Sequence, residues 1–175
     1  MISQQGSTLV VSLVLLVALT LLGASSLQST LLEEKMAGNY KDSSRAFQAT
    51  EAALRAGEDW LQVQAELPNA LPSNIGNSDV WSYNAPSTGG SVPNWWNERD
   101  EVWWGNNGVS YTAQLDGVTN DPEYLIEEQS FIRDTLNVGI KTDNSGRVFY
   151  RVTSRGTGAR PTTRSLLQST YTRRY

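Results

Sequence analysis

The sequence predicts an α+β fold in which a long N-terminal helix packs on a C-terminal antiparallel β-sheet of about four strands. The chain has 175 residues, which is enough for one buried core of ordinary size. A helical pattern without proline runs from the first residues to Pro68. Beyond residue 108, four strand-like segments follow one another, separated by short turn sequences.

The helix is expected to begin with a membrane-spanning segment at residues 7–32, which carry no charged side chain. From Leu9 to Leu27 the only polar residues are Ser and Thr, whose hydroxyls can bond to carbonyls of their own helix. At about 1.5 Å per residue, this run spans about 28 Å, close to the hydrocarbon thickness of a bilayer. A secretory signal peptide is the alternative, but such a peptide has a basic start and a shorter apolar run.

Residues 33–67 form the amphipathic second half of the predicted helix. Tyr40, Phe47, Leu54 and Leu61 recur every seven residues and place one apolar stripe on a polar helix. We expect this stripe to pack against the sheet, with a coiled coil as the alternative. Pro68 ends the helix because proline lacks an N–H and clashes with the preceding turn.

Residues 68–108 are expected to form a loop region rich in Trp and Asn. Two interpretations remain open for its tryptophans. In one, they form a partner- or sugar-binding surface, because Trp offers large rigid area beside adaptable Asn amides. In the other, they form a local core that holds a long irregular loop. The tryptophans that would contribute to a partner surface are Trp95, Trp96, Trp103 and Trp104.

The antiparallel sheet is expected within residues 109–175. Its strands are predicted at Val109–Asp116, Tyr124–Ile132, Val148–Gly156 and Thr163–Tyr171. Adjacent carboxylates on the second strand, Glu127 and Glu128, would point to opposite faces and therefore would not form a catalytic pair.

Charge is segregated along the chain. Residues 33–140 hold 6 basic and 17 acidic side chains, whereas residues 141–175 hold 8 basic and 1 acidic. Arg151 and Arg155 share one face of a strand, where we expect them either to pair with Glu127, Glu128 or carboxylates of the helix, or to form a docking surface for an acidic neighbour. Nucleic acid is not the expected partner, because no aromatic platform interleaves the arginines.

The composition argues against an enzyme. The chain contains neither histidine nor cysteine. This excludes disulfides, cysteine–histidine zinc sites, thiol nucleophiles and imidazole acid–base catalysis. No metal site and no cofactor are therefore expected.

The N-terminus resembles a known family. MISQQG, followed by Ser7 and an uncharged helix, resembles the processing site and stem of type IV prepilins. Four ordered segments further along resemble the PilX group of minor pilins: LLEEKMAGNYKDSSRAFQATEAALRAGEDWL, PEYLIEEQSF, YRVTSRGTGA and SLLQSTY. The resemblance implies a type IV pilin-like fold, a leader at residues 1–6, cleavage after Gly6 and N-methylation of Ser7. It places Leu9, Val10, Val11, Leu13 and Leu16 in the filament core.

The resemblance also implies a function. The expected protein is a minor pilin that helps to initiate type IV pilus assembly at or near the tip, with adhesion or twitching motility as further roles. Its partners would be other minor pilins, the major pilin, a tip adhesin, the prepilin peptidase and the inner-membrane assembly platform. It would lie in the bacterial inner membrane with a periplasmic head, and later in the extracellular pilus. The alternatives are a pseudopilin of a type II secretion system and a membrane-tethered carbohydrate-binding module.

Two departures from the pilin pattern bear on this expectation. The leader contains no Lys or Arg, so it is either truncated at its start or atypical. The fifth residue after the expected cut is Val11, where most pilins carry a glutamate. That glutamate would neutralise the amino terminus of a neighbouring subunit in the apolar filament core. Its replacement by valine predicts a position at the tip.

Overall fold

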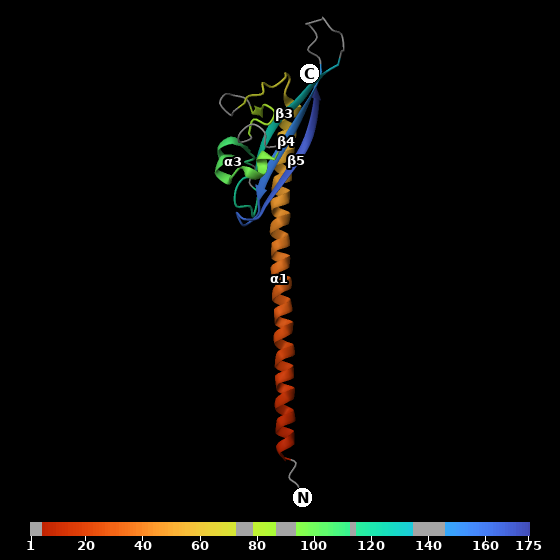
Figure 1. Cartoon of the computed structure of the whole chain (residues 1–175), viewed down its shortest axis with the longest axis vertical. Coiled ribbons are helices and arrows are strands. Elements are labelled where there is room, and N and C mark those ends of the chain that lie inside the picture. Colours follow the sequence, from red (N-terminus) through yellow and green to blue (C-terminus); the bar gives the residue numbers. More distant parts are fainter. Residues whose placement is uncertain (1–4, 73–78, 87–93, 113–114, 135–145) are drawn as a thin grey trace. The chain divides into compact units, whose positions relative to one another are not determined.

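The computed structural model describes residues 5–72, 79–86, 94–112, 115–134 and 146–175 (Figure 1). The chain divides into two compact units, Met1–Lys41 and Asp42–Tyr175. Helix α1 (Gln5–Val63) supplies the described part of the first unit and the first element of the second.

The first unit consists of the N-terminal part of α1. Every side chain described in it, from Ser7 to Lys41, is exposed. The helix is continuous from the apolar run into the polar sequence that follows, because neither proline nor a turn cluster interrupts it.

The second unit, the head, is built on a β-sheet. Strands β3 (Glu123–Arg133), β4 (Gly146–Thr157) and β5 (Arg164–Arg174) are antiparallel and lie side by side (Figure 1). Two short strands also pair with β3: β1 (Val80–Trp81) in parallel and β2 (Val109–Ser110) antiparallel. Helices α2 (Trp95–Glu98) and α3 (Glu101–Asn107) complete the described elements.

Alternation along the strands creates two packed faces. One face contributes Tyr124, Ile126, Val148, Tyr150 and Val152 to a core that also contains Ala53 and Leu61 of α1. The opposite face of β3 contributes Leu125, which packs with Trp81, Trp95 and Trp104. Because successive side chains on a strand point to opposite sides, one strand serves both cores. The sheet is thus a middle layer between α1 and the tryptophan-rich segment.

Small residues bring α1 close to the sheet. The buried positions of the helix lie on one face, three or four residues apart except for the adjacent pair Ala49 and Thr50: Asp42, Ala46, Ala49, Thr50, Ala53, Gly57 and Leu61. A Cβ atom added to Gly57 would lie 2.8 Å from Val152 Cγ1, and one added to Gly156 would lie 2.8 Å from Thr50 N. The close approach therefore depends on glycine on both sides of the contact.

The predicted heptad stripe is only half correct. Leu61 is fully buried and Leu54 packs partly buried against the core, but Phe47 is 47% and Tyr40 is 78% exposed. Helix–sheet packing was therefore wrong for Tyr40 and Phe47. A seven-residue repeat drifts by about 20° per heptad on a straight helix, so the stripe rotates away from a fixed face. In the first turns of the head, the neighbouring Ala46 occupies that face instead.

The three long strands are confirmed, and the sheet differs from the prediction in its two short strands, β1 and β2. The predicted strand Val109–Asp116 pairs only at Val109–Ser110, and its residues 113–114 lie outside the described residues. The parallel strand β1 was missed within the predicted loop region. A two-residue strand is too short to show an alternating pattern. The sheet is accordingly mixed and has five strands.

Candidate functional site

The N-terminal part of α1 exposes a continuous apolar surface. Its expected filament-core residues, Leu9, Val10, Val11, Leu13 and Leu16, are between 56% and 68% exposed. This helix is long and apolar enough to cross a membrane. Such a surface needs lipid or other apolar helices around it, because exposing it to water is unfavourable.

Two of the polar side chains within the apolar run, Ser12 and Thr20, donate to carbonyls of their own helix, as predicted. Ser12 Oγ donates to the Leu9 carbonyl at 2.9 Å, and Thr20 Oγ1 donates to the Val17 carbonyl at 2.8 Å. An unsatisfied hydroxyl would be costly in hydrocarbon, and these bonds remove that cost. The expected processing residues, Gly6 and Ser7, lie in the first turn of α1.

The tryptophans of residues 81–104 form a compact cluster, here called the tryptophan cluster: Trp81, Trp95, Trp96, Trp103 and Trp104. The Trp95 ring centre lies 5.6 Å from those of Trp103 and Trp104, and Trp96 meets Trp95 edge-on at 5.8 Å. Offset and edge-to-face contacts of this kind stabilise aromatic pairs by about 0.5–1.5 kcal/mol. The cluster covers the sheet face opposite α1.

A buried ion pair holds the tryptophan cluster on the sheet. Glu127 is fully buried, and its carboxylate accepts two hydrogen bonds from Arg151, each 2.9 Å long. It also accepts from Trp95 Nε1 at 3.1 Å and from the Asn84 backbone N–H at 3.2 Å. Arg151 lies 4.8 Å from the centre of the Trp96 ring. Four donors therefore compensate one buried carboxylate.

These contacts change the predicted partner surface. Trp95 and Trp104 have no exposed area and Arg155 is 6% exposed, so the partner-surface interpretation fails for these three, and the local-core interpretation holds for the two tryptophans. The physical reason is the local core: the rings pack on Leu125 and on each other. The side chain of Arg151 is 18% exposed and pairs with Glu127, as one of the two interpretations expected. Trp96 and Trp103 are half-buried.

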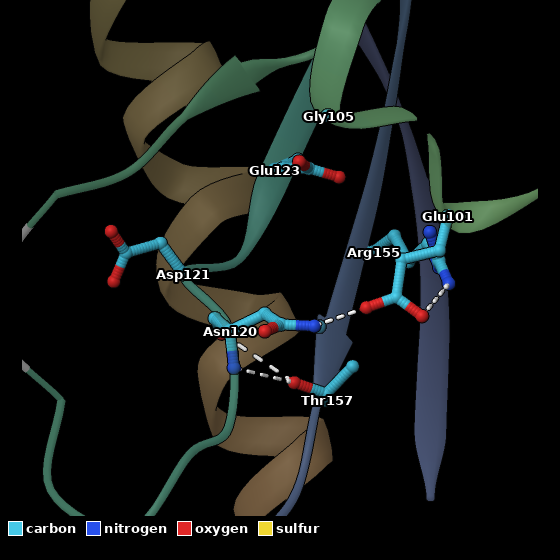
Figure 2. A pocket seen from close by; sticks show the side chains of 8 residues that line it. Glu101, Gly105, Asn120, Asp121, Glu123, Arg155 and Thr157 are labelled. Atoms are coloured by element: carbon cyan, nitrogen blue, oxygen red, sulfur yellow. Dashed lines mark hydrogen bonds and ion pairs between the residues drawn. The ribbon is translucent and has the colours of Figure 1, made fainter. Parts of the chain in front are cut away.

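A pocket of about 220 Å³ lies where α3 approaches the ends of β3 and β4 (Figure 2). Glu101 and Arg155 lie next to each other on one side of it, with Arg155 Nη2 3.9 Å from Glu101 Oε2. Asn120 donates its side-chain amide to Glu101, and its backbone N–H donates to Thr157 Oγ1 at 3.2 Å. The pocket is thus bridged by hydrogen bonds between its own walls.

Glu123, which lines this pocket, has a raised pKa. Burial raises the pKa of Glu123 to about 7, the nearby Arg155 charge lowers it and the Glu101 charge adds to the increase. Its register partner across the sheet is Arg155. Among the described residues, no three His, Cys, Asp or Glu side chains form a group that could hold a metal ion.

Sequence reasoning missed two structural positions. Asp42 is buried near the start of the head, where its Oδ1 accepts from the Ala159 N–H at 2.6 Å and ties the helix to the β4–β5 turn. Gly156 allows the helix backbone to approach β4. The spacing of Gly156 and Gly158 was the available signal, because two glycines beside a strand end often mark a close approach.

Comparison with protein families gives two matches. The PilX N-terminal model matches residues 5–55, and the model described as Type IV pilus assembly protein PilX C-term matches residues 39–173. No curated protein sequence and no solved structure matched. The second model alone covers more than half of the chain and includes the described residues of both head cores.

Proposed function

The chain belongs to the PilX family of type IV pilus assembly proteins, so it is a membrane-anchored minor pilin, and we propose that it helps to initiate assembly at or near the pilus tip. Membership of the family implies interaction with other pilus components and a structural role. The single observation that supports the tip position is Val11, an apolar side chain in the exposed part of α1.

The stem is proposed to mature as in other prepilins. Residues 1–6 are removed as a leader by cleavage after Gly6, and Ser7 is then N-methylated. Residues 7–32 first span the inner membrane, with the head in the periplasm, and later enter the filament core. The exposed apolar side chains of this segment support both stages, because lipid tails and neighbouring pilin helices offer equally apolar surroundings.

The tip position follows from the charge that Val11 lacks. A glutamate at this position would pair with the amino terminus of the subunit above. At an effective dielectric constant of ~20, two unit charges at ~4 Å interact by roughly 4 kcal/mol before desolvation. A subunit inside the filament would forgo this interaction and leave its neighbour's amine unpaired. The first subunit has none above it and loses nothing.

The proposed partners are the other minor pilins, the major pilin, a large tip adhesin and the assembly platform. Adhesion and twitching motility would then depend on this chain through the pili that it helps to start. A pseudopilin of a type II secretion system remains the nearest alternative, and the family match favours the pilus. A carbohydrate-binding module is disfavoured because Trp95 and Trp104 are buried.

Deletion and copy number test this function. Deleting the gene in the native host should abolish surface pili while major pilin synthesis continues, and the wild-type gene should restore pili. Quantitative mass spectrometry of sheared pili should find a few copies per filament, with immunogold label at the ends. Label along the whole shaft, or a copy number near that of the major pilin, would contradict the tip position.

A charge variant sharpens this test. Val11→Glu should still insert into the membrane and should spread the protein along the shaft. Val10→Glu is the matched control, because it adds the same charge about 100° around the helix. Equal distributions for both variants would show that the position of the carboxylate is irrelevant.

A further inference from the structure

A second pocket, of about 170 Å³, lies on the sheet face opposite α1, between α2 and the start of β5. Its walls include Trp96, Asn97, Arg99, Arg155, Arg164 and Ser165. We propose that this arginine pocket receives the carboxylate of an acidic side chain from another subunit of the pilus. The proposal rests on the proposed function, since it names a contact that this minor pilin makes during assembly.

The charge of the arginine pocket is one-sided. Among the described residues, three guanidinium groups line it and no carboxylate does. Arg99 is fixed in place, because its Nε donates to the Pro86 carbonyl at 2.8 Å and its guanidinium lies 4.6 Å from the Trp103 ring centre. The Arg164 side chain is exposed and makes no ion pair or hydrogen bond with any described residue. The pocket therefore presents one positioned cation and one available cation.

Arg155 supplies the buried cation of the pocket. Its side chain is 7% exposed, yet its only ion pair with a described residue is the 3.9 Å contact with Glu101, which is longer than a hydrogen bond. The Glu101 side chain is itself 50% exposed. By comparison, the guanidinium group of Arg151 on the same strand donates two hydrogen bonds of 2.9 Å to Glu127. A guanidinium carries five N–H donors, so Arg155 retains donors for a second carboxylate.

Size and chemistry define the occupant. The volume lies below the roughly 300–1,000 Å³ of small-molecule sites, so the pocket suits one side chain better than a free ligand. A carboxylate matches the fork geometry of arginine and would replace the water lost by a buried cation. The half-buried Trp96 ring would cover the apolar part of an Asp or Glu side chain. A pilus subunit is the partner that family membership provides.

Site-specific photocrosslinking in the piliated host tests the proposal on the full chain. A photoreactive residue at Asn97, on the exposed wall, should crosslink to a peptide of another pilus subunit that contains Asp or Glu. Arg164→Glu should lower the crosslink yield by about tenfold. Arg147→Glu makes the same charge change at an exposed position at the start of β4 and should leave the yield unchanged.

A charge swap decides between direct pairing and an indirect effect. Replacing the crosslinked acidic residue by Arg in the partner should restore the crosslink to the Arg164→Glu variant. No crosslink from the wild-type chain, a crosslink only to a second copy of this chain, or equal yields for the two charge variants would overturn the proposal.

Failure of this proposal and failure of the proposed function give different results. If pili still require the chain and contain it while Arg164→Glu behaves like Arg147→Glu, only the arginine pocket is refuted. If pili assemble normally without the chain, the proposed function itself is refuted.

Discussion

At the residue scale, Glu127 connects the sheet to the tryptophan cluster. Its carboxylate is fully buried and receives donors from a strand, a loop and α2. Removing one member of a buried pair leaves the other charge uncompensated, which costs more than the pair contributes. The contact of Arg151 with the Trp96 ring adds a cation–π interaction to the same group.

Glu127→Gln should therefore destabilise the head by about 3 kcal/mol, at the lower end of the 3–5 kcal/mol range for buried pairs because Arg151 retains some exposure. The measurement is the denaturant midpoint for unfolding of the full chain in detergent, with tryptophan fluorescence as the signal. Glu51→Gln is the matched control, since it breaks the exposed Arg55–Glu51 pair and should cost at most about 0.5 kcal/mol. Equal effects would contradict a structural role for the buried pair.

Glu123 predicts how stability depends on pH. Its pKa in the folded chain is about 7 because of burial, against 4.5 for the ordinary group. Between these values the folded state holds a proton that the unfolded state has released, so this group lowers stability as pH rises from about 4.5 to 7. Relative to the wild type, Glu123→Gln should become more stable over that interval. Thermal melts at pH 5 and pH 8 check this, and an unchanged difference between the two proteins would contradict it.

At the element scale, the stability of the head depends on how closely α1 packs against the sheet. Small helix residues lie against the sheet, Gly57 against Val152 and Thr50 against Gly156 of β4, whereas the larger side chain of Phe47 remains half-exposed. Thr50 Oγ1 donates to the Ala46 carbonyl at 2.6 Å, so its hydroxyl is satisfied within the close contact. Packing is therefore limited by backbone distance as well as by apolar area.

Substitutions at Leu61 and Phe47 should have unequal effects. Leu61→Ala removes a fully buried side chain and should cost about 2–5 kcal/mol. Phe47→Ala removes a half-exposed one and should cost less than about 1 kcal/mol. Denaturant midpoints of the two variants measured under one condition give the comparison. A larger cost at Phe47 would mean that the heptad stripe does face the core.

Gly156→Ala should destabilise the head by about 1–3 kcal/mol, because the new methyl group would lie 2.8 Å from the Thr50 backbone nitrogen. Gly105→Ala is the control. It lies in α3, its added Cβ would meet nothing closer than 3.6 Å, and alanine favours helix, so stability should stay equal or rise. A neutral Gly156→Ala variant would show that the helix can move away without cost.

The sequence predicted the long elements well and their contacts less well. Strands β3, β4 and β5 follow from clear apolar alternation, and α1 follows from a long run without proline. The buried face of α1 was harder to predict. A seven-residue repeat rotates slowly around the helix, and the contact is made by small residues, so a stripe of large apolar side chains does not mark that face. Arg155 could be placed on a strand face, but the strand pattern does not reveal its burial beside Trp96 and Glu101.

At the scale of the whole molecule, family membership and the chemistry of α1 define the protein. Two family models together match residues 5–173. The first unit exposes apolar side chains along a helix able to cross a membrane, and the second contains both packed cores. A minor pilin needs both, a stem for the membrane and filament and a folded head. The proposed cleavage after Gly6 would take place between the membrane-bound stage and the filament stage of the protein.

The mature N-terminal residue is the most direct test of this account. Mass spectrometry of the protein from purified membranes or sheared pili should find a chain that begins at Ser7 with a methylated amine. Gly6→Arg should leave the chain uncleaved in the membrane, because the proposed cleavage depends on a small residue at this site. Cleavage near residues 24–26 would instead identify an ordinary signal peptide and would contradict the pilin account.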